Sequence, residues 1–240
     1  MDKILLSIDW DFFFPTPEHD PHMIYDWGHS EGHSLYYGTI WTIRAADLLR
    51  NTGELPGTSG EEISFWNRFK FGEQATLFYS ESHKDILHPL VRPYTKDILN
   101  FDAHHDAGYT RPIGKPSAVR CDNWAEFLIK KGSNIQVVYP AWKPHAFDCE
   151  PASQVEIERI IDDGKDYEQE FDAVFVCRSG AWTPSWLDGS FDDFIKNCPL
   201  SKKVQVGQLI ERSWDGESAA RMAAIITEQI HEISSKKGGD

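Results

Sequence analysis

The chain has few cysteines, and none of them are paired in sequence. Its four cysteines, at positions 121, 149, 177 and 198, are far apart and form no C-x-x-C motif. This spacing indicates neither a disulfide framework nor a zinc site built from C-x-x-C pairs. Such cysteine usage fits a reducing compartment, so we expect a cytoplasmic protein.

Long hydrophobic runs are also missing. No apolar stretch approaches the roughly 20 residues that cross a bilayer, and the apolar part of MDKILLSIDWD is too short for a signal peptide. We therefore expect no membrane association.

Basic residues are scarce relative to acidic ones. The chain has 24 Lys and Arg against 38 Asp and Glu, which gives a formal net charge of -14. Such a balance disfavours a nucleic-acid partner and would attract a cationic substrate.

Apolar runs of strand length alternate with segments of helical spacing, a pattern typical of βα units around a parallel sheet. The expected strands cover residues 3–8, 75–80, 97–102, 135–140, 173–178 and 202–206. The expected helices cover residues 40–50, 83–91, 123–131, 192–197 and 217–234, and one face of the last should pack on the sheet. Segments 15–38 and 51–60 are expected to be long loops on one rim. We predict an α/β fold with a mainly parallel sheet, in a single domain over residues 1–240.

Side chains that bind metals follow two of the expected strands. Asp9 and Asp11 stand two apart in SIDWDFF, so in an extended chain both would point to the same side. His83 follows the run TLFYSES, at an expected turn into a helix. Ligands of open parallel sheets bind outside the carboxyl ends of the strands, where these residues should lie.

A third strand ends in the densest group of ionisable residues. In LNFDAHHDAGY, the i, i+2, i+4 spacing of Asp102, His104 and Asp106 lets three ligands face one centre, while His105 points elsewhere or supports the ligands from behind. Burying unpaired carboxylates is costly, and a cation is the simplest compensation.

Together these motifs offer four carboxylates and two imidazoles. Mostly hard oxygen donors suit manganese better than a tetrahedral structural zinc. Six ligands exceed what one ion needs, and shared carboxylates would support two ions that activate a water molecule. The set predicts a hydrolase.

Three other interpretations stay open. A D-x-D after a first strand also occurs in phosphatases of the haloacid dehalogenase type, although those need Thr or Val two residues after the second aspartate, where this chain has Phe13. A deacylase of the same broad fold would have fewer carboxylate ligands. A metal-stabilised binding protein without turnover is the third alternative, because ligands can persist without a catalytic acid.

The three motifs carry a family resemblance. FDAHHDAGY resembles the D-A-H-x-D motif of the arginase and agmatinase (ureohydrolase) family, SIDWDFF is similar to its S-x-D-x-D motif, and ESHKD is similar to the motif with the remaining histidine ligand. The resemblance implies a three-layer α/β/α fold and two manganese ions. Asp9 and Asp102 would bridge the ions, with His83 and Asp106 completing one ion, and Asp11 and His104 the other.

The order of the motifs differs from the usual ureohydrolase order. The S-x-D-x-D strand comes first here, so the strand order would be permuted in sequence. This arrangement is similar to an atypical arginase-like subfamily with N-terminal S-I-D-x-D, which includes peptide arginases of ribosomal-peptide biosynthesis. That resemblance implies conversion of arginine to ornithine, with release of urea, in an arginine-containing precursor peptide.

Hydrolysis of a guanidinium group also needs a proton donor for the departing amine. Histidine suits this role, and the candidates are His29, His33, His105 and His145, with His29 preferred. Taken singly, a histidine of this kind is more often a surface or structural residue than a proton donor.

Binding of the guanidinium group requires an acceptor or an aromatic face. The segment IYDWGHSE offers Asp26, Trp27 and Glu31. Asn123 could contact substrate or cap a helix, and the cap is the first expectation.

Overall fold

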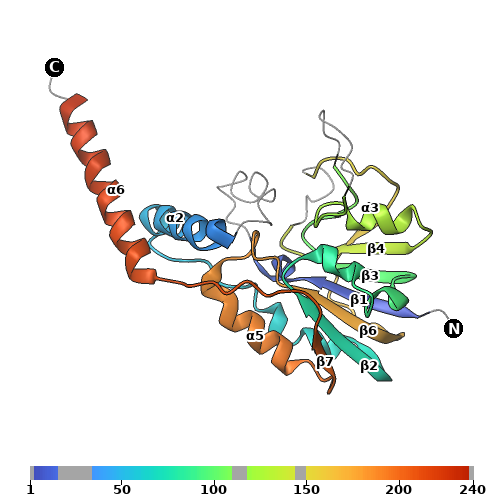
Figure 1. The fold of residues 1–240 in the computed structure, drawn as a ribbon. Coiled ribbons are helices and arrows are strands. Elements are labelled where there is room, and N and C mark those ends of the chain that lie inside the picture. Colours follow the sequence, from blue (N-terminus) through green and yellow to red (C-terminus); the bar gives the residue numbers. More distant parts are fainter. Residues whose placement is uncertain (1–2, 16–33, 110–117, 144–149, 238–240) are drawn as a thin grey trace.

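The protein is an α/β fold built on one seven-stranded sheet. The computed structural model describes residues 3–15, 34–109, 118–143 and 150–237 (Figure 1). The strands are β1 (Ile4–Asp9), β2 (Lys70–Ser80), β3 (Asp97–Phe101), β4 (Asn134–Tyr139), β5 (Glu158–Ile161), β6 (Glu170–Cys177) and β7 (Lys203–Gln205). All neighbouring strands are parallel, which confirms the predicted class.

The strand order does not follow the sequence. The sheet runs β5-β4-β3-β1-β6-β2-β7, so the first strand of the chain lies at its centre. β1 pairs with β3 on one side, where Ile8 faces Phe101, and with β6 on the other, where Asp9 faces Cys177. The carboxyl ends of strands distant in sequence therefore meet at one edge of the sheet.

The described residues form four α-helices and six short 3₁₀ helices. The α-helices are α2 (Ser34–Thr52), α3 (Trp124–Ile129), α5 (Asp188–Asn197) and α6 (Gly216–Lys237). The 3₁₀ helices are η1 (Trp10–Phe13), η2 (Glu61–Ile63), η3 (Phe65–Arg68), η4 (His83–Leu87), η5 (Arg92–Tyr94) and η6 (Ser185–Leu187).

One face of the sheet carries an aromatic core. Phe191, Phe194 and Ile195 recur at helical spacing on α5 and pack against Leu6 and Ile8 of β1. Rings from η1, η3 and the strands fill the rest of this layer, which accounts for many of the 14 phenylalanines. Burial of these large rings is a main source of stability for this side.

The other face is covered by α3 and η4. Trp124, Ala125 and Leu128 of α3 pack against strand residues such as Leu5, which points away from Leu6 because successive strand side chains alternate. Helical elements thus lie on both faces of the sheet.

One predicted helix is absent, and another is present but packs differently from the prediction. Residues 83–91 form the 3₁₀ helix η4 and turns instead of an α-helix, because Pro89 interrupts the segment and cannot donate a backbone hydrogen bond. The helix expected at 217–234 is present as α6, but it packs against α2 and not on the sheet, and it extends away from the body (Figure 1). The rim loops are also shorter than expected, because α2 already begins at Ser34 and ends at Thr52.

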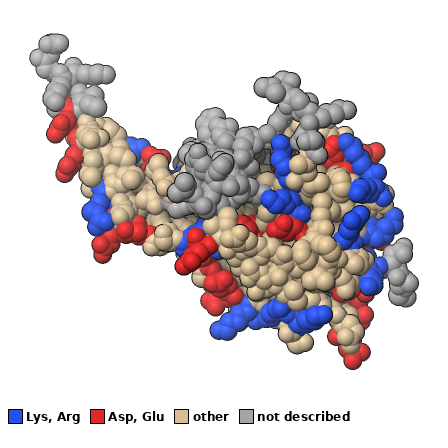
Figure 2. Space-filling view, in the orientation of Figure 1, with Lys and Arg blue, Asp and Glu red and all other residues tan. Residues whose placement is uncertain are grey.

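The surface drawn in Figure 2 mixes charges of both signs. Basic and acidic side chains are interspersed around a large uncharged area, so the excess of acidic residues forms no single patch on this face. Among the described helices, none combines the length and the apolar character needed to cross a membrane.

Candidate metal centre

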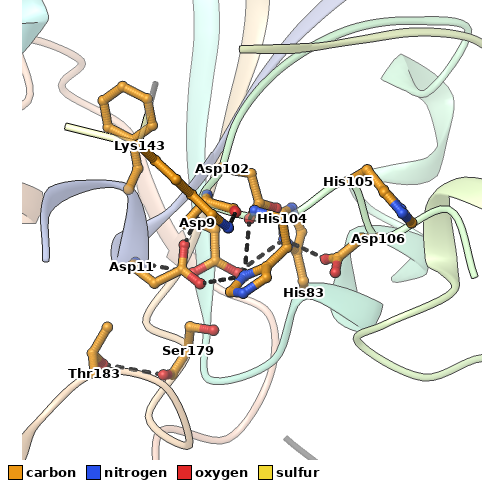
Figure 3. Close-up of polar contacts among 12 residues, drawn as sticks. Asp9, Asp11, His83, Asp102, His104, His105, Asp106, Lys143, Ser179 and Thr183 are labelled. Atoms are coloured by element: carbon orange, nitrogen blue, oxygen red, sulfur yellow. Dashed lines mark hydrogen bonds and ion pairs between the residues drawn. The ribbon is translucent and has the colours of Figure 1, made fainter. Parts of the chain in front are cut away.

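Six predicted metal ligands converge at the carboxyl edge of the sheet (Figure 3). Asp9 ends β1, Asp11 lies in η1 and His83 begins η4. The other three, Asp102, His104 and Asp106, follow β3. All six side chains are buried. They form two groups that could each hold a metal ion.

The first group surrounds one nitrogen of His83. The Nδ1 atom lies 3.1 Å from Oδ2 of Asp9, 3.3 Å from Oδ2 of Asp102 and 3.4 Å from Oδ2 of Asp106. Because Nδ1 can donate at most one hydrogen, it cannot satisfy three carboxylates at once. A cation at their common centre would attract all four groups.

The second group shares a member with the first. The Nδ1 atom of His104 lies 2.9 Å from Oδ2 of Asp11 and 3.8 Å from Oδ1 of Asp102. Asp102 thus belongs to both groups, as its two oxygens face the two histidines. This is the arrangement of a carboxylate that bridges two ions, whereas Asp9 belongs to the first of the two groups alone.

The ring of His83 is held from three sides. It lies between the rings of Trp124 and Phe175, at centroid distances of 4.5 Å and 5.8 Å. Its Nε2 atom lies 2.8 Å from the hydroxyl of Ser7 on β1. When Nε2 carries the hydrogen and donates it to Ser7, the lone pair of Nδ1 faces the carboxylates, as a metal ligand requires.

Hydrogen-bond donors orient the carboxylates. The backbone N–H of Asp11 donates to Asp9 (3.1 Å), as the amino-terminal cap of η1. The backbone N–H of His104 and the amide of Asn100 donate to the two oxygens of Asp102 at 2.8 Å and 3.1 Å. The indole of Trp124 donates to Asp106 at 2.7 Å. These bonds hold one oxygen of Asp9, one of Asp106 and both of Asp102, and so fix the orientation of all three carboxylates.

The loop after β3 requires unusual backbone angles. Asp106 has a φ of 49° and Gly108 a φ of 72°, both in the left-handed region. The left-handed angle favours glycine at position 108, where a Cβ atom would also displace the carboxylate of Glu126. Asp106 is itself a candidate ligand, and residues with strained backbone angles are common in functional sites.

Burial and mutual repulsion change the acidity of these carboxyls. Burial, together with the charges of Asp11 and Asp102, raises the pKa of Asp9 to about 7. Burial and the charges of Asp106 and Asp11 raise the pKa of Asp102 to about 7 as well. Burial raises the pKa of Asp106 to about 6. These carboxyls are therefore destabilised as anions, and a cation would relieve that cost.

The neighbouring carboxylates raise the pKa values of His83 and His104, which favours their charged forms. Burial by itself lowers the pKa of His83, but hydrogen bonds with Asp102, Asp106 and Asp9 outweigh it and place the pKa well above its usual value. Burial and Lys143 oppose protonation of His104, yet Asp11 raises its pKa to about 9. Burial would likewise raise the pKa of Asp11, but His104 lowers it overall. Positive charge is thus favoured at both groups.

The donor set fits divalent cations of intermediate hardness. Each group has one imidazole nitrogen, with three carboxylates in the first and two in the second. Such oxygen-rich sets with an imidazole suit manganese, and iron, cobalt or nickel are chemically related candidates.

His105 is directed away from the centre (Figure 3). Its Nδ1 atom accepts from the backbone of Ala107, and its Nε2 atom lies 2.9 Å from the carbonyl of Pro151. Burial lowers its pKa. Because both ring nitrogens are engaged within the fold, we assign His105 a structural role.

Asn123 holds the chain that leads into α3. It lies at the amino-terminal cap position, but its side chain makes no capping bond to the helix. Instead its carbonyl oxygen accepts from the backbone of Arg120 at 2.7 Å, and its amide approaches the carbonyl of Ala118. Its polar atoms are therefore occupied within the fold.

The other predicted site residues lie outside the described part of the chain. These are Asp26, Trp27, His29 and Glu31, together with the alternative histidines His33 and His145.

Three residues near the centre were missing from the predicted site. Cys177 ends β6 and lies close to Asp9 and His83. Lys143 follows β4 and reaches toward the cluster, and it donates to the carbonyl of Ala103 (Figure 3). Trp182 lies with its ring 5.0 Å from that of His104. Cys177 and Lys143 could have been found by extending the strand-end rule to every expected strand.

A buried carboxylate supports the ligand loop from behind. Glu150 accepts hydrogen bonds from the backbone of His105 (2.9 Å), the hydroxyl of Tyr109 (2.7 Å) and the hydroxyl of Tyr139. Interactions with His105, His104 and Lys143 overcome the effect of burial and lower the pKa of Glu150. No sequence motif marks this residue, because its partners come from separate segments.

Comparisons with protein-family models, with curated proteins and with solved structures find no match to this chain.

Proposed function

We propose that the protein is a manganese-dependent hydrolase that converts arginine side chains to ornithine and releases urea. The observation that carries this proposal is the presence of two buried Asp/His groups that share Asp102. A pair of adjacent cations with a common carboxylate is a typical arrangement for hydrolysis.

The residues divide into two ligand sets. Asp9, His83, Asp102 and Asp106 would hold one ion, while Asp11, Asp102 and His104 would hold the other. When bound, the cations would supply Lewis acidity that lowers the pKa of water and makes it a nucleophile near neutral pH. This chemistry is needed because charge delocalisation makes a guanidinium carbon a poor electrophile.

The reaction has a simple balance. Water adds to the guanidinium carbon, the bond between that carbon and the side-chain nitrogen breaks, and urea leaves with the two terminal nitrogens. The remaining amine must gain a proton. We retain His29 as the donor for this step, since the ring nitrogens of His105 are engaged with Ala107 and Pro151.

The surroundings of the site favour a cationic substrate. The formal charge of the chain is -14, and a buried acidic cluster attracts positive groups. Trp182 adds an aromatic face beside His104, at which a guanidinium group could stack. We propose that Trp182 acts together with Asp26, Trp27 and Glu31 in substrate binding.

The peptide substrate is proposed from resemblance. The motifs SIDWDFF, ESHKD and FDAHHDAGY are similar to those of atypical arginase-like proteins that act on arginine within ribosomal precursor peptides. The proposed partner is therefore an arginine-containing precursor peptide.

The phosphatase alternative fits the geometry less well. In that mechanism Asp9 would attack a phosphate group, but Asp9 shares its group with Asp102 and Asp106. Carboxylates placed this closely would repel a phosphate dianion unless cations neutralised them. A binding protein without turnover would have the same ligands, so an activity assay is needed to distinguish it from the proposed hydrolase.

An assay with manganese tests the proposal. The protein is incubated with Mn²⁺ and an arginine-containing peptide, and the peptide mass and released urea are measured. We expect each modified arginine to acquire the mass of ornithine, with one urea released per modification. Turnover of free arginine alone would refute the peptide assignment, and absence of urea from both substrates would refute the hydrolase.

A matched pair of variants tests the site. Asp102→Asn removes the shared charge, whereas Asp97→Asn changes the aspartate that begins β3, at the end of the strand away from the ligands. We expect loss of urea release and of metal retention in the first variant alone. Equal activity in both variants would contradict the proposed site.

A further inference from the structure

Cys177 lies beside the first ligand group. It is the last residue of β6, and its backbone is the register partner of Asp9 on β1. Its Sγ atom, a carboxylate oxygen of Asp9 and a ring nitrogen of His83 all lie within 4.8 Å of one another. The cysteine is fully buried.

The position of the sulfur is fixed by the local fold. Sγ donates to the carbonyl of Glu81 at 3.2 Å, and the Glu81 side chain is held by Arg178 and by the backbone of Gly180. Cys198 differs, because it packs in the apolar core beside α5, where burial raises its pKa to about 11. Cys177 thus lies at the ligand group, and Cys198 is a buried cysteine elsewhere for comparison.

Two donor sets of different softness thus share Asp9 and His83. With Asp102 and Asp106 they form an oxygen-rich set that suits manganese. With Cys177 they form a set of one sulfur, one nitrogen and one carboxylate, and such donors are typical of zinc. An ion that binds sulfur would lie closer to β6 than an ion bound by Asp106.

We propose that Asp9, His83 and Cys177 form a thiophilic metal site that binds Zn²⁺ in competition with Mn²⁺ at the first ligand group. Binding would release the thiol proton to solvent, break the hydrogen bond to the Glu81 carbonyl and form a sulfur–metal bond. The inference rests on the proposed metal centre and adds to it a control of activity by the type of metal present.

Cobalt reports directly on a sulfur ligand. Metal-free protein is titrated with Co²⁺, and the near-ultraviolet absorption of thiolate-to-cobalt charge transfer is recorded for the wild type, Cys177→Ala and Cys198→Ala. We expect the absorption in the wild type and in Cys198→Ala but not in Cys177→Ala. Zn²⁺ should displace the cobalt, and about tenfold more Zn²⁺ should be needed for half-saturation of Cys177→Ala.

X-ray absorption of the zinc-loaded wild type provides a second test, which is valid even if Cys177→Ala fails to fold. We expect one sulfur neighbour at about 2.3 Å from zinc. A first shell of oxygen and nitrogen alone, or cobalt absorption that persists in Cys177→Ala, would overturn the inference.

These measurements do not depend on turnover. A sulfur signal without urea release would overturn the proposed hydrolase and leave the thiophilic site in place. Urea release without any sulfur signal would overturn the thiophilic site alone.

Discussion

The Nε2 atom of His83 lies 2.8 Å from the hydroxyl of Ser7, and this contact directs the other ring nitrogen toward three carboxylates. Ser7 belongs to the central strand, whereas His83 begins η4 after the more distant strand β2. The contact therefore couples the position of a candidate ligand to the central strand of the sheet.

Removal of this hydroxyl should weaken metal binding. Without Ser7, the His83 ring loses the acceptor that fixes its tautomer, so Ser7→Ala should reduce affinity for Mn²⁺ at the first site by about tenfold or more. Calorimetric titration of metal-free protein measures this. Ser80→Ala is a matched control, because Ser80 is also a buried strand serine but bonds to Asp85. Equal losses in both variants would indicate general damage to the fold.

Stabilisation by metal should increase with pH. The pKa values of Asp9 and Asp102 are raised to about 7 and that of Asp106 to about 6, while unfolded carboxyls titrate near 3.8. Between these values the folded metal-free protein binds more protons than the unfolded chain, so its stability falls as pH rises. The raised pKa of His83 acts in the same direction, because its contribution is lost at high pH.

Thermal unfolding from pH 5 to pH 8 tests this expectation. With a chelator present, the unfolding midpoint should decrease across the range. With Mn²⁺, the decrease should be smaller, so that the difference between the two midpoints grows with pH. A constant difference would contradict the competition between protons and metal at these carboxyls.

Replacement of Trp182 should affect substrate binding more than turnover. Its ring lies 5.0 Å from that of His104, so Trp182→Ala should raise KM for an arginine peptide by about fivefold, with a smaller change in kcat. Trp182→Phe retains an aromatic face and should remain close to the wild type. Trp186→Phe is a control in the tryptophan cluster with Trp41 and Trp214. A kcat loss with unchanged KM would rule out a binding role.

Loss of Glu150 should destabilise the ligand loop. Glu150→Ala leaves the hydroxyls of Tyr109 and Tyr139 and the backbone N–H of His105 without their acceptor, at a cost of about 3 kcal/mol in the free energy of unfolding. Denaturant titration measures the loss. Glu156→Ala, at an exposed position nearby, should stay within about 0.5 kcal/mol of the wild type.

The strands were more predictable than their order. Six of the seven strands overlap the predicted ranges, because buried parallel strands are continuous apolar runs. β5 (Glu158–Ile161) was missed, since it is short, lies at the sheet edge and is only partly buried. The placement of β1 between β3 and β6 depends on long-range pairing, which local sequence patterns do not contain.

The ligand motifs were visible in the sequence because each follows a strand. Their convergence was a hypothesis from spacing, and the structure brings all six together in two groups. The roles of supporting residues were harder to predict. The spacing already indicated that His105 could point away from the centre, but its bonds to Ala107 and Pro151 depend on the folded loop and could not be predicted.

The most direct test of the metal centre is a crystal structure of the Mn²⁺-loaded protein with anomalous diffraction. We predict two manganese peaks, one bound by Asp9, His83, Asp102 and Asp106 and the other by Asp11, Asp102 and His104, with Asp102 bonded to both. A single peak, or two peaks without a shared Asp102, would contradict the proposed two-ion centre.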